Sequence, residues 1–291
     1  MFVASKKSFM DIFYEIENLQ IILEQHRKKN FKIGLVPTMG ALHEGHLKLI
    51  HEAVKENDIV VCSIYVNPIQ FTNVTDLEKY PRQLETDRMM LESAGCAILF
   101  APTDQVMYPQ SPITQFSFGY LEQIMEGVYR KNHFSGVGIV VSKLFNIIQP
   151  DTAYFGQKDL QQVAVIRQLI NDLSFPIELK CIPTIRAETG LAMSSRNKRL
   201  SAEQLIIASQ IYQWLKQGEI LLKETKSVSK TIEIITNQIN QKRDFKLDYF
   251  QIVDAETLKE IQDLSNHSKI ALCIAAYLGE VRLIDNLIIF M

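Results

Sequence analysis

Two histidines, His43 and His46, stand three residues apart in the stretch VPTMGALHEGHLKLI, residues 36–50. A zinc-binding HExxH helix spaces its histidines four residues apart, and Gly45 would weaken a helix here. The stretch follows a short apolar run that stops at Pro37, where a strand would give way to a helix. Backbone N–H groups at such a junction favour an anion, and imidazoles can donate hydrogen bonds to phosphate oxygens. The spacing therefore argues against a zinc site, and the position after a strand favours a phosphate site over inert packing.

Two later segments offer further groups suited to phosphate. GQKD, residues 156–159, follows a strand-like run and supplies Lys158 as a point cation, while Asp159 could hold ribose hydroxyls. A lysine at a helix start is unfavourable unless an anion offsets its charge. MSSRN, residues 193–197, combines two hydroxyls with a guanidinium, although a serine-rich helix cap would have a similar sequence.

The elements that must position these residues alternate between strands and helices. Strand-like runs are expected at 32–37, 58–68, 97–102, 152–156 and 177–183, and helical spacing is expected at 11–25, 45–57, 76–95, 138–149 and 160–173. This alternation predicts an α/β fold with a parallel sheet. Ligands of such sheets bind outside the carboxyl ends of the strands, which is where the histidine and GQKD segments begin.

The pattern changes beyond about residue 185. Two amphipathic helices, 202–224 and 227–242, precede three strand-like runs at 247–255, 269–278 and 281–290. Helices followed by adjacent strands are typical of a small α+β domain. We therefore expect a larger domain over residues 1–184 and a smaller α+β domain over residues 185–291.

Composition restricts the partners and the compartment. The formal net charge of −2 gives no basic surplus for nucleic acid. The cysteines, which form no Cys-x-x-Cys pair and mostly lie in apolar runs, are expected to be reduced thiols: Cys62, Cys96, Cys181 and Cys273. The first 20 residues lack a secretory signal, and no run has transmembrane length. We expect a cytoplasmic protein with neither a nucleic-acid nor a membrane partner.

The motifs resemble those of the pantothenate synthetase (pantoate–β-alanine ligase) family, within the HxGH nucleotidyltransferase superfamily. The similarity runs, in order, through PTMGALHEGHLKLI, SIYVNPIQF, YPRQLETD, HFSGV, VVSKLFNIIQPDTAYFGQKDLQQVAVIRQL and MSSRN. It implies a Rossmann-like parallel-sheet domain with a smaller α+β C-terminal lid domain. It also implies that ATP and pantoate form an enzyme-bound pantoyl adenylate with release of pyrophosphate, and that β-alanine then gives pantothenate and AMP. Magnesium with ATP and a homodimer are further implications.

The resemblance also assigns roles to residues. It implies that His43, His46 and Lys158 are catalytic and stabilise phosphate charge, while leaving open whether His46 also transfers a proton. The implied ATP site consists of Met39, Gly40, Ala41, Leu42, His43, Glu44, Gly45, His46, Gly156, Gln157, Lys158, Asp159, Ile185, Met193, Ser194, Ser195 and Arg196. Gln70 and Gln162 would bind pantoate, and Gln70 would also help with β-alanine. No protein metal ligand is assigned.

The sequence departs from the family pattern at several positions. Lys131 and Asn132 replace a frequent proline–glycine pair, which leaves the local loop shape open. Gln157 replaces a frequent glutamate, and we expect this to be tolerated because no assigned role uses that side chain. Tyr65 replaces a more usual phenylalanine, with unknown consequence. Two alternatives remain, another HxGH nucleotidyltransferase without a β-alanine site and a non-catalytic nucleotide-binding module.

Overall fold

The computed structural model describes residues 10–265 and 267–290, which divide into two compact units. The first contains the described residues through Phe116, with Ser135–Phe155 and Leu169–Ile182. The second contains Ser117–Phe134, Gly156–Gln168 and the described residues from Pro183 onward. The division at residue 184, with nucleotide binding before it and a lid after it, stays a prediction. The expected absence of a secretory signal rests partly on residues 1–9, outside the described residues.

A six-stranded sheet forms the centre of the first unit, in the order β1-β4-β3-β2-β5-β6. Its strands are β1 (Asp11–Phe13), β2 (Ile33–Thr38), β3 (Ile59–Ile64), β4 (Ile98–Phe100), β5 (Thr152–Gly156) and β6 (Glu178–Ile182). The pairs β1–β4, β4–β3, β3–β2 and β2–β5 are parallel. The helices of this unit are α1 (Ile16–Arg27), α2 (Glu44–Glu56), α3 (Val74–Glu78), α4 (Leu84–Ser93), α5 (Asp104–Met107) and α7 (His133–Ile148), of which α7 enters the unit at Ser135. Helix α8 (Leu160–Asp172) belongs to the second unit through Gln168 and to the first from Leu169.

The central strand β2 is buried on both faces. Leu35 and Val36 are consecutive, so their side chains point to opposite faces, yet both are fully buried. Val36 packs in one cluster with Ile50 of α2 and Leu91 of α4. Burial on both faces explains why the strand sequences are continuous apolar runs rather than alternating ones.

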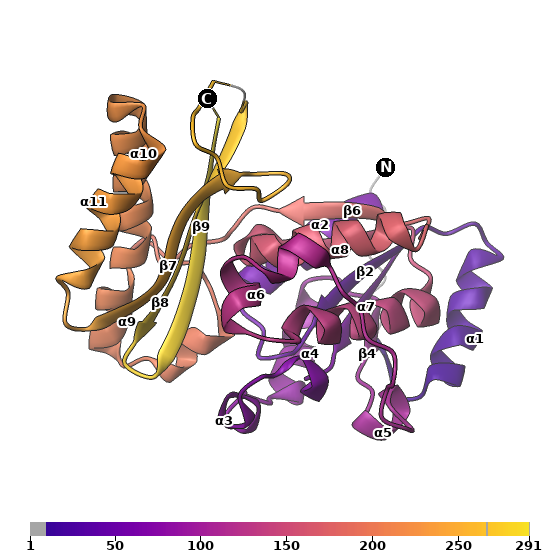
Figure 1. Ribbon diagram of the computed structural model, residues 1–291. Helices are drawn as coiled ribbons and strands as arrows, with labels where there is room; N and C mark the ends of the chain where they lie inside the picture. Colours follow the sequence, from indigo (N-terminus) through magenta and orange to yellow (C-terminus); the bar gives the residue numbers. More distant parts are fainter. Residues whose placement is uncertain (1–9, 266, 291) are drawn as a thin grey trace, which may run out of the picture. The chain divides into compact units, whose positions relative to one another are not determined.

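A three-stranded antiparallel sheet, β7-β8-β9, forms the centre of the second unit. Its strands are β7 (Phe245–Asp254), β8 (Lys269–Leu278) and β9 (Val281–Phe290), and its helices are α6 (Met125–Tyr129), α9 (Ala202–Ala208), α10 (Gln210–Thr225) and α11 (Val228–Asn240). Helices α10 and α11 lie side by side against this sheet (Figure 1). The expected combination of a Rossmann-like sheet with a smaller α+β domain is confirmed.

Alternate residues of β8 face different layers, as the pleat requires. Leu272 packs in the cluster that contains α10 and α11. Cys273 packs in another cluster with Ile124 and Leu160, which come from earlier parts of the chain. The small sheet is therefore covered on both faces, and the second cluster explains why segments 117–134 and 156–168 belong to the second unit.

Four expected helices have clearly different limits, and the one expected over 138–149 already begins at His133. The helix expected over 11–25 begins only at Ile16, because Asp11–Phe13 pairs with β4 instead. The helix expected over 76–95 is split into α3 and α4, because Pro81 lacks an N–H group and restricts the residue before it. The helix expected over 202–224 ends at Ala208 and restarts at Gln210, and the intervening Ser209 hydroxyl donates to the Ile206 carbonyl.

Candidate active site

The carboxyl ends of β2 and β5 are neighbours in the large sheet. Strand β3 lies on one side of β2 and β5 on the other, so the strand order reverses between them. Open parallel sheets bind ligands at such a switch point. Segment 39–46 follows β2, and segment 156–159 starts at the last residue of β5. Both expected phosphate-binding segments thus originate at the switch point.

A buried carboxylate holds the turn after β2. Asp87, which is 0% exposed, accepts the Ala41 N–H at 2.7 Å and the Leu42 N–H at 2.8 Å. The Gly40 N–H donates to the Thr38 hydroxyl at 3.2 Å. These three N–H groups therefore donate to other groups of the protein, and the anion bound by the Ala41 and Leu42 N–H groups is the Asp87 carboxylate. A contact between residues 39–42 and ATP stays a prediction.

The same turn adopts an unusual backbone conformation. Gly40 has a φ of 76° and Ala41 a φ of 52°, both in the left-handed region. An L-residue pays about 1–2 kcal/mol there, so the two Asp87 hydrogen bonds must hold Ala41 in place. A side chain at position 40 would also lie 3.0 Å from the Asp87 carboxylate. The turn is thus a rigid entry into α2.

His43 and His46 lie together at the start of α2. His43 caps the helix, and its Nδ1 accepts the Gly45 N–H at 3.1 Å. A ring nitrogen that accepts carries no proton, so His43 is neutral and its proton is on Nε2. The two ring centroids are 4.1 Å apart, a distance at which two imidazolium ions would repel each other. The pair therefore suits a ligand that brings negative charge.

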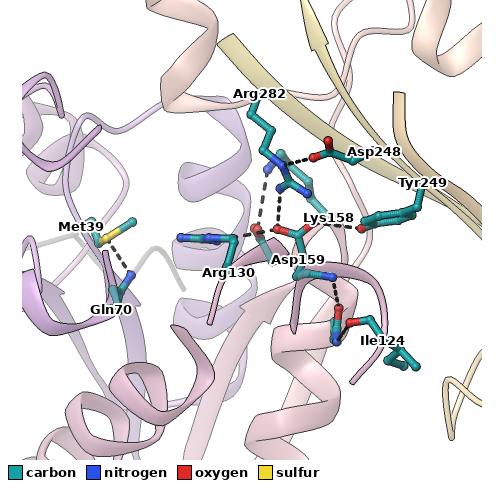
Figure 2. A network of polar contacts seen from close by, with 11 residues as sticks. Met39, Gln70, Ile124, Arg130, Lys158, Asp159, Asp248, Tyr249 and Arg282 are labelled. Atoms are coloured by element: carbon teal, nitrogen blue, oxygen red, sulfur yellow. Dashed lines mark hydrogen bonds and ion pairs between the residues drawn. The ribbon is translucent and has the colours of Figure 1, made fainter. Parts of the chain in front are cut away.

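Gln70 also lies at this turn. It ends a short 3₁₀ helix, η1 (Pro68–Gln70), and is 7% exposed. Its amide nitrogen donates to the Met39 sulfur at 3.1 Å (Figure 2). The structure therefore brings together Gln70 and Met39, two predicted site residues that the sequence separates by 31 positions.

In the second unit, Asn286 of β9 holds the GQKD segment, which forms the 3₁₀ turn η3 (Gln157–Asp159). The Asn286 amide donates to the carbonyls of Gln157 and Lys158, each at 2.9 Å, and accepts from the Gln157 side chain at 3.1 Å. The Gln157 side chain thus has a contact that the sequence did not suggest, because its amide donates where a glutamate could not; that the change is tolerated stays a prediction. Lys158 is mostly buried, with its ammonium 3.7 Å from Asp159.

Asp285, the residue before Asn286, holds segment 185–193, which contains the predicted site residues Ile185 and Met193. Met193 donates its N–H to the Ile185 carbonyl at 2.9 Å, which closes a hairpin. Arg186 in this hairpin pairs with buried Asp285 through two hydrogen bonds of 2.5 Å and 2.9 Å. Burial raises the pKa of Asp285, and the Arg186 charge opposes that rise. Asp285 and Asn286 therefore anchor segments 185–193 and 156–159 to the same point of β9.

MSSRN forms a cap and a 3₁₀ turn, η4 (Ser195–Arg199). The Ser194 hydroxyl oxygen accepts the Arg196 N–H at 3.3 Å, so its hydrogen can still donate. Ser195 is buried. Gln162 is half-buried on the first turn of α8. The structure thus fixes the Ser194 hydroxyl at the backbone of Arg196.

A buried network of charges lies elsewhere in the second unit (Figure 2). Glu126 accepts from Arg282 at 2.7 Å and from the Tyr249 hydroxyl at 3.0 Å. Burial acts to raise the pKa of Glu126, but Arg282, Arg130 and the Tyr249 hydroxyl together outweigh it and the pKa is lowered. Arg130 lies 3.7 Å from the same carboxylate. Burial lowers the pKa of Arg130 to about 10, and the charge of Arg196 acts in the same direction. Arg282 also donates to the Asp248 carboxylate at 2.7 Å, so the charges of Glu126 and Asp248 offset those of Arg282 and Arg130.

The sequence model of the Pantoate-beta-alanine ligase family matches residues 11–288. The chain belongs to the pantoate–β-alanine ligase family. It is 51% identical to the pantothenate synthetase of Cytophaga hutchinsonii over 277 residues, which cover 95% of this chain and 98% of the relative. It is 44% identical to the pantothenate synthetase of Bacteroides thetaiotaomicron, with 96% and 98% coverage.

Solved structures of this family have the same fold. Pantothenate synthetase from Thermus thermophilus superposes with a TM-score of 0.89 at 40% identity, covering 96% of this chain and 99% of that one. Pantoate-beta-alanine ligase from Francisella tularensis has a TM-score of 0.81 at 38% identity, with 96% and 97% coverage. The Francisella structure is a complex with β-γ ATP and β-alanine.

Sequence reasoning missed the residues that hold the motifs of this chain. Asp87 lies inside a motif that resembles the family, but it received no role. The spacing of Leu84, Asp87 and Leu91 on α4 places a carboxylate on the apolar face of a helix, which was an available signal. Asn286 lies within the apolar strand VRLIDNLIIF, where a buried amide likewise needs partners.

Proposed function

We propose that the chain catalyses the ATP-dependent condensation of pantoate with β-alanine. A pantoate carboxylate oxygen attacks the α-phosphorus of ATP, and pyrophosphate leaves to give pantoyl adenylate. The β-alanine amine then attacks the acyl carbon, loses a proton and displaces AMP, which gives pantothenate. The observation that carries this proposal is the family match over residues 11–288.

The chemistry of the first step explains the kind of residues assigned to it. Negative charge builds on the phosphate oxygens as the carboxylate attacks, so donors and cations lower the barrier more than a base does. We assign this role to His43, His46 and Lys158. His43 suits it because capping through Nδ1 leaves Nε2–H as its donor. Charge stabilisation by His46 needs no proton transfer, because pyrophosphate is a good leaving group.

We assign ATP binding to segments 39–46, 156–159 and 193–196 together with Ile185. The N-cap geometry of His43 and the Ser194 hydroxyl, whose oxygen accepts the Arg196 N–H and whose hydrogen can donate, support this assignment. We assign pantoate binding to Gln70 and Gln162. An amide can both donate and accept, which matches a substrate with hydroxyl and carboxylate groups.

We propose that Mg²⁺ accompanies ATP and is held mainly by phosphate oxygens and water. Within the described part of the chain, no cluster of three or more His, Cys, Asp or Glu side chains could hold a metal ion. A Mg²⁺ ion delivered with a nucleotide does not need such a cluster, because the ion keeps several of its waters and binds one or two protein carboxylates at most. When bound, the ion neutralises phosphate charge and helps pyrophosphate leave.

We also propose a cytoplasmic homodimer. The thiols of Cys62, Cys96 and Cys273 are buried and that of Cys181 is exposed, as suits a reducing compartment. No helix among the described residues combines the length and apolar character needed to cross a membrane. The dimer rests on resemblance to the family. Analytical ultracentrifugation tests it, with a monomer near 33.4 kDa as the contradicting result.

An omission assay tests the proposed reaction. Purified protein is given ATP, Mg²⁺, pantoate and β-alanine, and pantothenate and AMP are measured with each substrate withheld in turn. We expect equal amounts of pantothenate and AMP only in the complete mixture. AMP transfer to a phosphate ester without any use of β-alanine would instead support a plain nucleotidyltransferase.

A further inference from the structure

We propose that Asn67 and Tyr108 are positioning residues that fix which end of the Gln70 amide is presented to substrate. The inference rests on the proposed function and deepens it, because it states what kind of substrate atom Gln70 can bind. All the residues that carry it lie in the first unit.

The orientation of the Asn67 amide is set by a backbone carbonyl. Asn67, 1% exposed, places one atom of its amide 3.2 Å from the Gly136 carbonyl oxygen and 3.1 Å from the Gln70 side chain. A carbonyl oxygen can only accept, so the Asn67 atom facing it must be the NH₂ group. The Gln70 atom that faces the same NH₂ group must then be its oxygen.

The Gly136 carbonyl can take this position only because residue 136 is glycine. A Cβ there would lie 2.6 Å from the Ile69 carbonyl oxygen and 2.7 Å from the Gln70 Cα. These contacts are far shorter than backbone atoms tolerate. Glycine thus lets α7 approach η1 closely enough for Asn67 to bridge them.

Tyr108 fixes the orientation of the Asn67 amide through the amide oxygen. Its hydroxyl lies 2.9 Å from the Asn67 oxygen, which can only accept, so the hydroxyl donates. Burial raises the pKa of Tyr108, which keeps the hydroxyl protonated and able to donate. A flipped Asn67 would set two donors against each other at Tyr108 and two acceptors against each other at Gly136.

The consequence is a defined polarity at Gln70. Its oxygen is turned to Asn67, so its NH₂ group points to the Met39 sulfur at 3.1 Å. A thioether is a weak acceptor, and a carboxylate or hydroxyl oxygen would replace it favourably. Gln70 therefore binds an acceptor atom of the substrate. The ammonium group of β-alanine, which can only donate, does not bind there, so any help that Gln70 gives β-alanine goes to its carboxylate.

Asn67→Asp is the sharpest test, since it replaces the donor with an acceptor of the same size. Gln70 should then turn its NH₂ group to the introduced carboxylate and present its oxygen to substrate. We expect KM for pantoate to rise roughly 10- to 100-fold, the loss of one or two hydrogen bonds, while KM for ATP changes less than about threefold. Position 67 is 1% exposed, and burial raises the pKa of a carboxyl, so the introduced carboxylate is expected to take up a proton well above its usual range. Its protonated form restores a donor, so the defect should shrink as the pH is lowered.

Tyr108→Phe and Tyr65→Phe form a matched pair. Their rings lie 6.1 Å apart, but the Tyr65 hydroxyl donates to Asp104 at 2.8 Å and has no part in orienting Gln70. We expect Tyr108→Phe to raise KM for pantoate about 3- to 10-fold with little change in kcat, and Tyr65→Phe to change neither. Circular dichroism checks that each variant is folded.

If the wild-type enzyme makes pantothenate, any one of three outcomes for the variants would overturn the proposal. They are an unchanged KM for pantoate in Asn67→Asp, a defect in that variant that does not depend on pH, and equal effects of the two tyrosine changes. A wild-type protein that makes no pantothenate would instead contradict the proposed function itself.

Discussion

Replacing Asp87 with asparagine tests how the turn that carries the histidines is held. The carboxylate has two oxygens, one for the Ala41 N–H and one for the Leu42 N–H, at 2.7 Å and 2.8 Å. Asparagine has one oxygen, so one of these N–H groups would face an NH₂ group instead. The substitution is nearly isosteric, so packing is preserved and the hydrogen bonds are what changes.

The expected magnitude follows from the two hydrogen bonds. A buried N–H without an acceptor costs about 1–3 kcal/mol, and the remaining bond loses the strengthening that a charged acceptor gives, about 1 kcal/mol. The free energy of opening the turn should therefore fall by about 3 kcal/mol, which is roughly a 100-fold larger opening constant. Since His43 starts α2 directly after this turn, kcat/KM for ATP should fall more than about tenfold.

Amide hydrogen exchange followed by mass spectrometry measures this opening in peptides covering residues 36–47. Asp151→Asn is a matched control, because Asp151 accepts the Ile33 N–H at 2.7 Å at the opposite end of the same strand. Asparagine can still accept that single N–H, so exchange in 36–47 should stay at the wild-type rate. The reasoning is refuted if Asp87→Asn leaves exchange there unchanged, or if the control accelerates it equally.

Three further predictions follow. His46→Ala should slow pyrophosphate release in a single turnover about 100-fold or more but change pantoate affinity by calorimetry less than about threefold, and equal losses would contradict its assignment. Asn286→Ala should lower kcat/KM for ATP roughly 10- to 100-fold by loosening the GQKD turn, whereas Asn240→Ala at an exposed helix end should not. Burial acts to raise the pKa of Asp254, but hydrogen bonds from Thr257 and His267 outweigh it and the pKa is about 2. A carboxylate with a lowered pKa stabilises the fold at pH values above its unfolded pKa of about 4, and this contribution is lost as the pH falls toward about 2. Asp254→Asn should therefore weaken the dependence of the melting temperature on pH between about 4 and about 2. A melting temperature that falls as steeply with pH in the variant as in the wild type would contradict this.

Features that depend on neighbouring residues in the sequence could be predicted. The strands β5, β8 and β9 have their expected limits, because apolar runs bounded by turn residues determine them locally. The position of the histidines at the start of α2 follows from the strand, glycine and helix signals that surround them. Pro81 was a visible reason to divide the helix expected over 76–95.

Features that depend on distant pairing could not be predicted. β1 has three residues and exists only because it pairs with β4, far along the chain. Asp87 lies 46 positions from Ala41, and Asn286 lies 128 positions from Lys158. The motif residues could thus be named from the sequence, but the groups that hold them depend on tertiary structure.

The central claim is that pantoate is activated as an adenylate before β-alanine reacts. A rapid-quench experiment with protein in excess over ATP, with Mg²⁺ and pantoate but without β-alanine, tests it most directly. We predict one pyrophosphate per ATP with the AMP moiety retained as an acyl adenylate, and later addition of β-alanine should release AMP and pantothenate in equal amounts. Pyrophosphate that appears only once β-alanine is present would contradict the claim.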